Sequence, residues 1–202
     1  MSSLFEKQSY VDWQSYGYTL KNIPPTWDNE YEFFDWKETF MIDEIPSNDV
    51  WNIPSTATKY QLEDMYRSLG INKEATKHYM ALNPKLDEGL NAILSHFPYK
   101  KLHYNFLKLT PGNNIMWHFD TYATFIKHND VTDDELKNIK RTGVLLSPWN
   151  FGQIIQVGNQ ILHNWKVGDC CTWTSDQWHG ASNFGFSDLV IMQITYVDDS
   201  QS

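Results

Sequence analysis

The chain has 202 residues and a formal net charge of −9 at neutral pH, with 41% hydrophobic and 15% aromatic residues. This composition predicts a globular domain with a sizeable core and excludes an intrinsically disordered chain. The acidic balance argues against nonspecific nucleic-acid binding, and no apolar stretch approaches the length of a membrane helix. We therefore expect a cytoplasmic protein without nucleic-acid or membrane partners, in which the adjacent Cys170 and Cys171 stay reduced.

We expect residues 1–202 to form a single domain in two parts. Residues 1–100 read as aromatic and helical support, and residues 101–197 as a core of strands. Within the first part, two short aromatic pieces predict strands at 16–20 and 32–36. Apolar residues at helical spacing predict helices at 62–70, 73–82 and 86–97. His78 and His96 would then be ordinary helix histidines, at the surface or half-buried.

From residue 102 the pattern changes to short strands separated by turns. The alternation at 102–109 predicts a strand, and a turn at 111–114 leads into a second strand at 115–120. A helix is expected within 130–139, where Thr132 and Glu135 form a capping-box pattern. Further strands are predicted at 121–127, 141–147, 153–157, 160–163, 170–174 and 188–197. Such regularly spaced short strands are typical of a jelly roll or barrel.

The strand at 115–120 carries the first candidate metal ligands. Residues two apart on a strand point to the same face, so His118 and Asp120 should project together. An imidazole beside a carboxylate is two thirds of the 2-His-1-carboxylate triad that binds non-haem Fe(II). His179 is the preferred third ligand. His163 is a rival at the end of a predicted hairpin strand, and His128 reads as a loop residue.

The ordered set of motifs over residues 102–197 resembles the 2-oxoglutarate/Fe(II)-dependent oxygenases. It comprises His118-x-Asp120, His179 and the closing strand that begins at Leu189. The segment Arg141-Thr142-Gly143-Val144-Leu145 and the turn Trp165-x-x-Gly168-Asp169 resemble, loosely, the aspartyl/asparaginyl β-hydroxylase or prolyl-hydroxylase-like branch. The resemblance implies an α+β protein that is mainly β, namely a cupin-like double-stranded β-helix with the metal near one open end.

The resemblance also implies a chemistry. Such enzymes couple oxidative decarboxylation of 2-oxoglutarate by O2 to hydroxylation of a second substrate, with His118, Asp120 and His179 as metal ligands and catalytic residues. Halogenating relatives have a small residue in place of the carboxylate, so Asp120 favours hydroxylation. The resemblance places the substrate among amino acids, peptidyl side chains and small metabolites.

The chain departs from the family in the residue that anchors the co-substrate. The family usually places an Arg or Lys shortly after the second histidine, where this chain has Ser187, Asp188 and Leu189. Arg141 is the leading replacement for holding the far carboxylate, because its guanidinium can form a bidentate pair. Tyr104 and Lys108 are the other candidate co-substrate residues, and Lys127, Thr124 and Thr172 are also on candidate elements.

Two further interpretations stay open at this point. The missing anchor would suit a cupin-like metal enzyme that uses no oxo acid. A jelly-roll binding module, whose aromatic surface holds a peptide or a sugar, is the non-enzymatic alternative.

Overall fold

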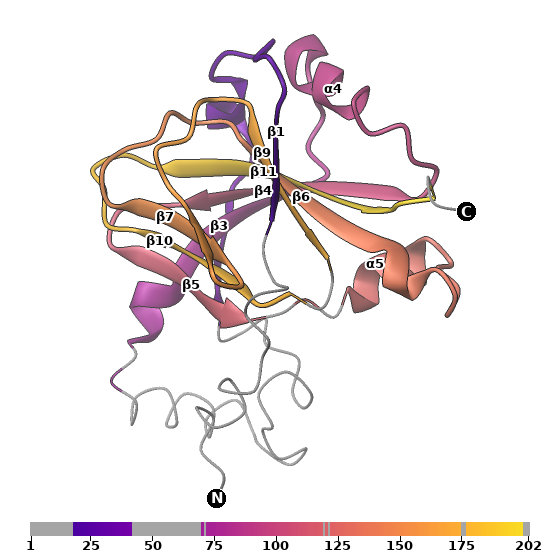
Figure 1. Ribbon diagram of the computed structural model, residues 1–202. Helices are drawn as coiled ribbons and strands as arrows, with labels where there is room; N and C mark the ends of the chain where they lie inside the picture. Colours follow the sequence, from indigo (N-terminus) through magenta and orange to yellow (C-terminus); the bar gives the residue numbers. More distant parts are fainter. Residues whose placement is uncertain are drawn as a thin grey trace, which may run out of the picture.

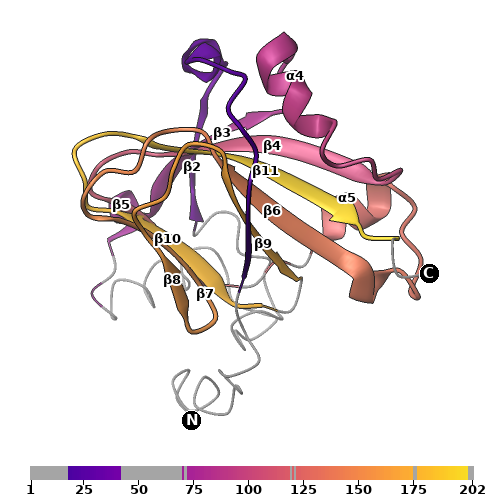
Figure 2. The ribbon, with the colours of Figure 1, turned by 45° about the horizontal axis from the view of Figure 1, so that its top comes forward.

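A computed structural model describes residues 18–41, 70, 72–118, 120, 122–174 and 177–199. In this part of the chain the strands form two antiparallel sheets, one of seven strands and one of four. The sheets lie against each other as two layers, and helix α4 (Glu88–Leu94) packs on the outer side of the larger sheet (Figures 1 and 2). Among the described helices, none combines the length and apolarity needed to cross a membrane.

Eight consecutive strands make up the barrel and alternate between the two sheets, except for one hairpin whose two strands both lie in the smaller sheet. The larger sheet has the order β1-β9-β6-β11-β4-β3-β2, and the smaller has the order β5-β10-β7-β8. The eight are β4 (Leu102–Leu109), β5 (Asn113–His118), β6 (Ile139–Leu145), β7 (Gln153–Val157), β8 (Gln160–Leu162), β9 (Asp169–Thr174), β10 (His179–Asn183) and β11 (Leu189–Val197). This alternation is a double-stranded β-helix, so the predicted fold is confirmed.

The N-terminal part contributes strands where helices are expected. Strands β1 (Thr19–Asn22), β2 (Lys37–Phe40) and β3 (Lys77–Leu82) extend the larger sheet. The predicted helix at 73–82 is wrong, because a short 3-10 turn, η2 (Lys73–Thr76), leads directly into β3, which pairs with β4. Pairing with a neighbouring strand overrides a weak helical period. The helix expected at 86–97 is confirmed as the shorter α4. Of the one expected at 62–70, all but Gly70 lies outside the described residues.

Three further elements differ from the sequence prediction. Residues 32–36 form no strand, since the 3-10 turn η1 (Glu30–Phe33) precedes β2. Helix α5 (Ala123–His128) replaces the strand expected at 121–127. The region 130–139 contains only the 3-10 turn η3 (Leu136–Asn138), although Glu135 Oε2 accepts a 2.7 Å hydrogen bond from the Thr132 backbone N–H. The capping contact therefore forms without the α-helix it predicts.

The larger sheet has an apolar core on each face. Phe106 packs on the outer face with Leu90 of α4, whereas Leu109 and Val157 pack between the two sheets. The two cysteines divide in the same way, since neighbouring residues of a strand point to opposite faces. Cys170 lies in the outer core and Cys171 in the inner one, both as free thiols. Burial raises the pKa of Cys170 to about 12, which keeps that thiol protonated and inert.

Phe106 provides a test of the outer core. Its side chain is fully buried, and its ring centroid lies 4.7 Å from that of Phe34. Phe106→Ala should lower the free energy of unfolding by about 3–5 kcal/mol, because it removes buried surface and leaves a cavity. Urea unfolding measures the change. Phe184→Ala is the matched control, since Phe184 is 66% exposed and its truncation should leave the midpoint nearly unchanged. Equal effects of the two variants would contradict this packing.

Candidate metal centre

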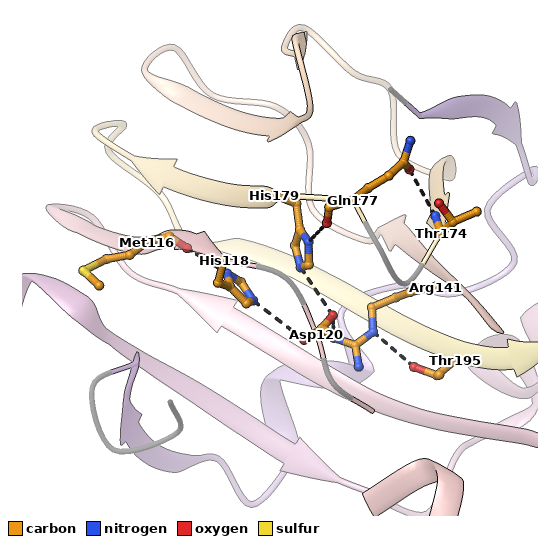
Figure 3. Close-up of polar contacts among 8 residues, drawn as sticks. All are labelled: Met116, His118, Asp120, Arg141, Thr174, Gln177, His179 and Thr195. Carbon is orange, nitrogen blue, oxygen red and sulfur yellow. Dashed lines mark hydrogen bonds and ion pairs between the residues drawn. The ribbon is translucent and has the colours of Figure 1, made fainter. Parts of the chain in front are cut away.

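Two neighbouring strands of the smaller sheet bring the two histidines together. His118 ends β5, His179 begins β10, and the two residues are register partners. Their ring centroids are 4.3 Å apart. Asp120 lies two residues beyond the end of β5, and its carboxylate turns toward both imidazoles (Figure 3). The prediction that His118 and Asp120 project together therefore agrees with this placement, although Asp120 is outside the strand.

The three side chains converge on one point. Asp120 Oδ1 is 3.7 Å from His118 Nε2, and Asp120 Oδ2 is 3.4 Å from His179 Nε2. One ligand atom from each residue can be chosen so that all lie within 4.8 Å of one another. Two imidazoles and one carboxylate suit Fe(II) and similar divalent metals. These residues thus form a possible metal site.

Hydrogen bonds orient both imidazoles for metal binding. His118 Nδ1 lies 2.7 Å from the Met116 carbonyl oxygen, and His179 Nδ1 lies 3.0 Å from that of Gln177. A carbonyl oxygen can only accept, so each Nδ1 carries the proton and each Nε2 keeps its lone pair. Burial, reinforced by the neighbouring His179, lowers the pKa of His118 to about 4, which leaves that ring neutral at physiological pH.

Arg141 on β6 holds the carboxylate from the other side. Its Nη1 is 2.7 Å from Asp120 Oδ2, and its Nε donates to Thr195 Oγ1 at 3.1 Å (Figure 3). The guanidinium carbon lies 4.7 Å from the centroid of the Tyr122 ring. Burial alone would raise the pKa of Asp120, but the Arg141 charge and the histidines outweigh it and hold that pKa well below its usual value. Asp120 is therefore an anionic ligand.

Tyr122 reaches this position through an unusual backbone conformation. Its φ of 52° and ψ of 20° lie in the left-handed region, and it immediately precedes α5. A non-glycine residue there costs of order 1 kcal/mol or more and persists only where its surroundings enforce it. The buried Tyr122 ring packs with Phe125 and Ile139, which fixes the ring beneath Arg141. The Tyr122 ring thus holds the Arg141 guanidinium in place, and Arg141 in turn holds the Asp120 carboxylate.

A pocket of about 210 Å³ opens onto the metal ligands. Its walls are mostly apolar, with residues such as Leu107, Ile155 and Ile191 from both sheets. His78, Asn105 and Gln193 add polar groups. The interpretation of His78 as a surface or half-buried helix histidine is wrong, because His78 is on β3, is 1% exposed and lines this pocket. Its strand, not a helix, turns it inward.

Two candidate co-substrate residues lie elsewhere. The Tyr104 hydroxyl donates to the Pro84 carbonyl at 3.1 Å, and Lys108 Nζ lies 4.7 Å from the centroid of the Trp36 ring. Both share the outer face of β4 with Phe106, whereas Asn105 and Leu107 face the pocket. Because side chains alternate between the two faces of a strand, Tyr104 and Lys108 point away from the site. His163 and His128 are exposed, after β8 and at the end of α5, and neither belongs to the cluster.

Several residues around the ligands are not apparent from the sequence. Thr195 and Trp173 are register partners of Arg141 on β11 and β9, and the Trp173 ring centroid lies 4.9 Å from that of His179. Alternation along β9 and β11 could have placed both on an inner face, but only the pairing register puts them beside Arg141. No sequence signal indicated the left-handed Tyr122.

Comparisons with known proteins give only distant structural likenesses. No family model matches the chain, and no curated protein matches it. A predicted oxalate decarboxylase from Thermotoga maritima is 17% identical with a TM-score of 0.38, over 60% of this chain and 81% of that one. KdgF from Halomonas sp. is 12% identical with a TM-score of 0.37, over 62% and 85%. The Schizosaccharomyces pombe Cnp3 cupin domain is 10% identical with a TM-score of 0.38, over 61% and 67%.

Histidine replacement tests the metal centre. His118→Ala and His179→Ala should each abolish stoichiometric Fe(II) binding, because two remaining ligands leave the metal weakly held. The apolar barrel core should keep both variants folded. Metal content after anaerobic loading and dialysis measures the effect, and thermal melting checks the fold. His163→Ala is the control, because this exposed side chain lies outside the cluster. Full iron content in His179→Ala would remove His179 from the ligand set.

Proposed function

We propose that the protein is an Fe(II)- and 2-oxoglutarate-dependent dioxygenase that hydroxylates an amino acid, a peptidyl side chain or a small metabolite. The observation that carries the proposal is the convergence of two Nε2 atoms and one ionised carboxylate on the wall of a pocket inside the barrel. This donor set is the facial triad, which leaves metal positions open to other molecules. The motifs that resemble the aspartyl/asparaginyl or prolyl-hydroxylase-like oxygenases support the same reaction.

In this proposal the bound iron supplies activation of O2, coupled to decarboxylation of the oxo acid. The protein side chains would hold the metal and orient its ligands. His118 and His179 keep their Nε2 lone pairs directed at one point, because their Nδ1–H groups are bonded to backbone carbonyls. Arg141 restrains Asp120 and supplies positive charge beside the ligands. The apolar walls of the pocket exclude bulk water from the reacting groups.

Arg141 is the proposed partner of a carboxylate of the oxo acid. Among the described residues that line the pocket, it is the one Lys or Arg. Its guanidinium lies at the level of the metal ligands, 2.7 Å from Asp120. A carboxylate beside the metal is therefore better placed to meet it than one at the far end of the pocket. Lys108 and Tyr104 have no such role in the proposal, since they occupy the outer face of β4.

The second candidate is a cupin-like metal enzyme that uses no oxo acid. One observation favours it, namely that the Arg141 charge is already paired with Asp120. In that enzyme the same three ligands would hold the metal, and Arg141 would serve only to fix Asp120. The two candidates differ in whether a 2-oxo acid chelates the metal.

Anaerobic spectroscopy separates the candidate functions. Fe(II) plus 2-oxoglutarate should give a weak metal-to-ligand charge-transfer band in the visible region, and admission of O2 with a substrate panel should release succinate. Free amino acids and peptides make up the panel. Iron binding without the band would support the enzyme that uses no oxo acid. Absence of both iron binding and the band would contradict the metal site and leave a binding module.

Replacement of Arg141 tests its contact with the co-substrate. Arg141→Ala should raise the apparent KM for 2-oxoglutarate by about ten- to a hundredfold, the range expected for a lost charge-assisted contact. Iron should bind more weakly but not be lost, because all three ligands remain while Asp120 loses its ion pair with Arg141. Lys108→Ala is the matched control, because it removes a cation from the outer face of the same sheet. An unchanged KM in Arg141→Ala would show that this guanidinium does not hold the oxo acid.

A further inference from the structure

Two carboxamides face the pocket side by side on neighbouring strands. Asn105 of β4 and Gln193 of β11 are direct register partners, and both line the pocket that contains the metal ligands. Asn105 Oδ1 is buried without a hydrogen-bond partner, and the Gln193 side chain is half-buried. A buried acceptor without a hydrogen-bond partner costs free energy. The Asn105 oxygen is therefore a place where a bound ligand could supply the missing donor.

The pairing register fixes how deep these carboxamides lie. Thr195 pairs with Arg141 on one side and His103 on the other, which marks the level of the metal ligands. Gln193 is two residues along β11 from Thr195, roughly 7 Å further in at the usual strand rise. A molecule the size of 2-oxoglutarate, chelated at its oxo-acid end, would project its other end to about this depth. Leu107 and Ile191 then close the pocket with apolar surface.

The charge distribution along the pocket is uneven. The guanidinium of Arg141 is at the metal end, where it is bonded to Asp120. At the level of Asn105 and Gln193, the remaining register partner is Gly143, which has no side chain. No Lys or Arg among the described residues lines this deeper part. A buried carboxylate without a cation costs several kcal/mol, whereas two carboxamides supply both donors and acceptors to a neutral group.

We propose that Asn105 and Gln193 form a subsite for a neutral, hydrogen-bonding end group, such as a carboxamide, on the oxo acid that occupies this pocket. The ligand N–H donates to Asn105 Oδ1, and the Gln193 amide donates to the ligand carbonyl. The subsite therefore selects a 2-oxo acid with a neutral polar end over the dicarboxylate 2-oxoglutarate. This inference rests on the oxygenase part of the proposed function and modifies its co-substrate, since an oxo acid with a neutral end would bind more tightly than 2-oxoglutarate.

A matched pair of unreactive ligands tests the selection. N-oxalylglycine has the shape and charges of 2-oxoglutarate, and N-oxalylglycinamide differs from it only by a carboxamide in place of the far carboxylate. Calorimetric titration of the full-length, Fe(II)-loaded protein without O2 should show about tenfold or tighter binding of the amide. Equal affinity, tighter binding of N-oxalylglycine, or no binding of either would each overturn the subsite.

Substitutions at Gln193 provide the second half of the test. Gln193→Leu should remove most of the preference for the amide, and Gln193→Arg should reverse it, because a guanidinium pairs with a carboxylate and not with an amide. Asn105→Leu removes the unpaired acceptor and should act like Gln193→Leu, which keeps the test decisive if an arginine at position 193 prevents folding. Gln156→Leu is the control, because Gln156 of β7 bonds the Gly158 carbonyl and does not line the pocket.

The outcomes also distinguish this inference from the proposed function. A charge-transfer band with 2-oxoglutarate together with a preference for N-oxalylglycine would keep the oxygenase and overturn the subsite. Binding of the amide without succinate formation from 2-oxoglutarate would keep the subsite and change the co-substrate. An unchanged preference in Gln193→Leu and in Asn105→Leu would assign the selection to other residues and overturn the roles proposed for these two carboxamides.

Discussion

The contact between Arg141 and Asp120 is the interaction on which the site depends. Asp120 lies beyond the end of its strand, so the backbone pairing that fixes His118 does not fix it. The 2.7 Å ion pair with Arg141 does so instead, and Arg141 is itself positioned by Thr195 and by the Tyr122 ring. A buried carboxylate would otherwise be protonated or unpaired. The arginine thus keeps Asp120 anionic and directed at the two imidazoles.

Because strand register sets the depth of each side chain, the polarity of the pocket changes from one level of the barrel to the next. On the inner face of the larger sheet, the level of Arg141 and Thr195 is polar and charged. The next level, with Asn105 and Gln193, is polar and neutral, and beyond it Leu107 and Ile191 are apolar. Such a gradient suits a ligand whose charged end lies at the metal and whose other end is neutral. The outer face is occupied by the α4 core, so substitutions there act on stability.

The chain has no Arg or Lys at residues 187–189, and the neutral inner part of the pocket agrees with this. Close to these positions in the chain, β11 presents Gln193 to the pocket. A carboxamide differs from a guanidinium in charge and in the number of donors, which agrees with the proposed preference for a neutral end group. The metal ligands are independent of this change, because they come from β5, from the turn after β5 and from β10.

The sequence alone determined most of the strand pattern of residues 102–197, except at 121–139, and the likeness of His118, Asp120 and His179 to a metal triad. Alternation along a strand and the short His-x-Asp spacing are local features, so they can be recognised without knowing which strands pair. Local pattern also misled, as with His78, where a helical period concealed a strand that exists only because it pairs with β4. The tertiary structure decided the rest. The fold put Tyr104 and Lys108 on the face of β4 that points away from the pocket. It also brought Arg141 to Asp120 and paired Gln193 with Asn105, because these contacts join distant segments of the chain.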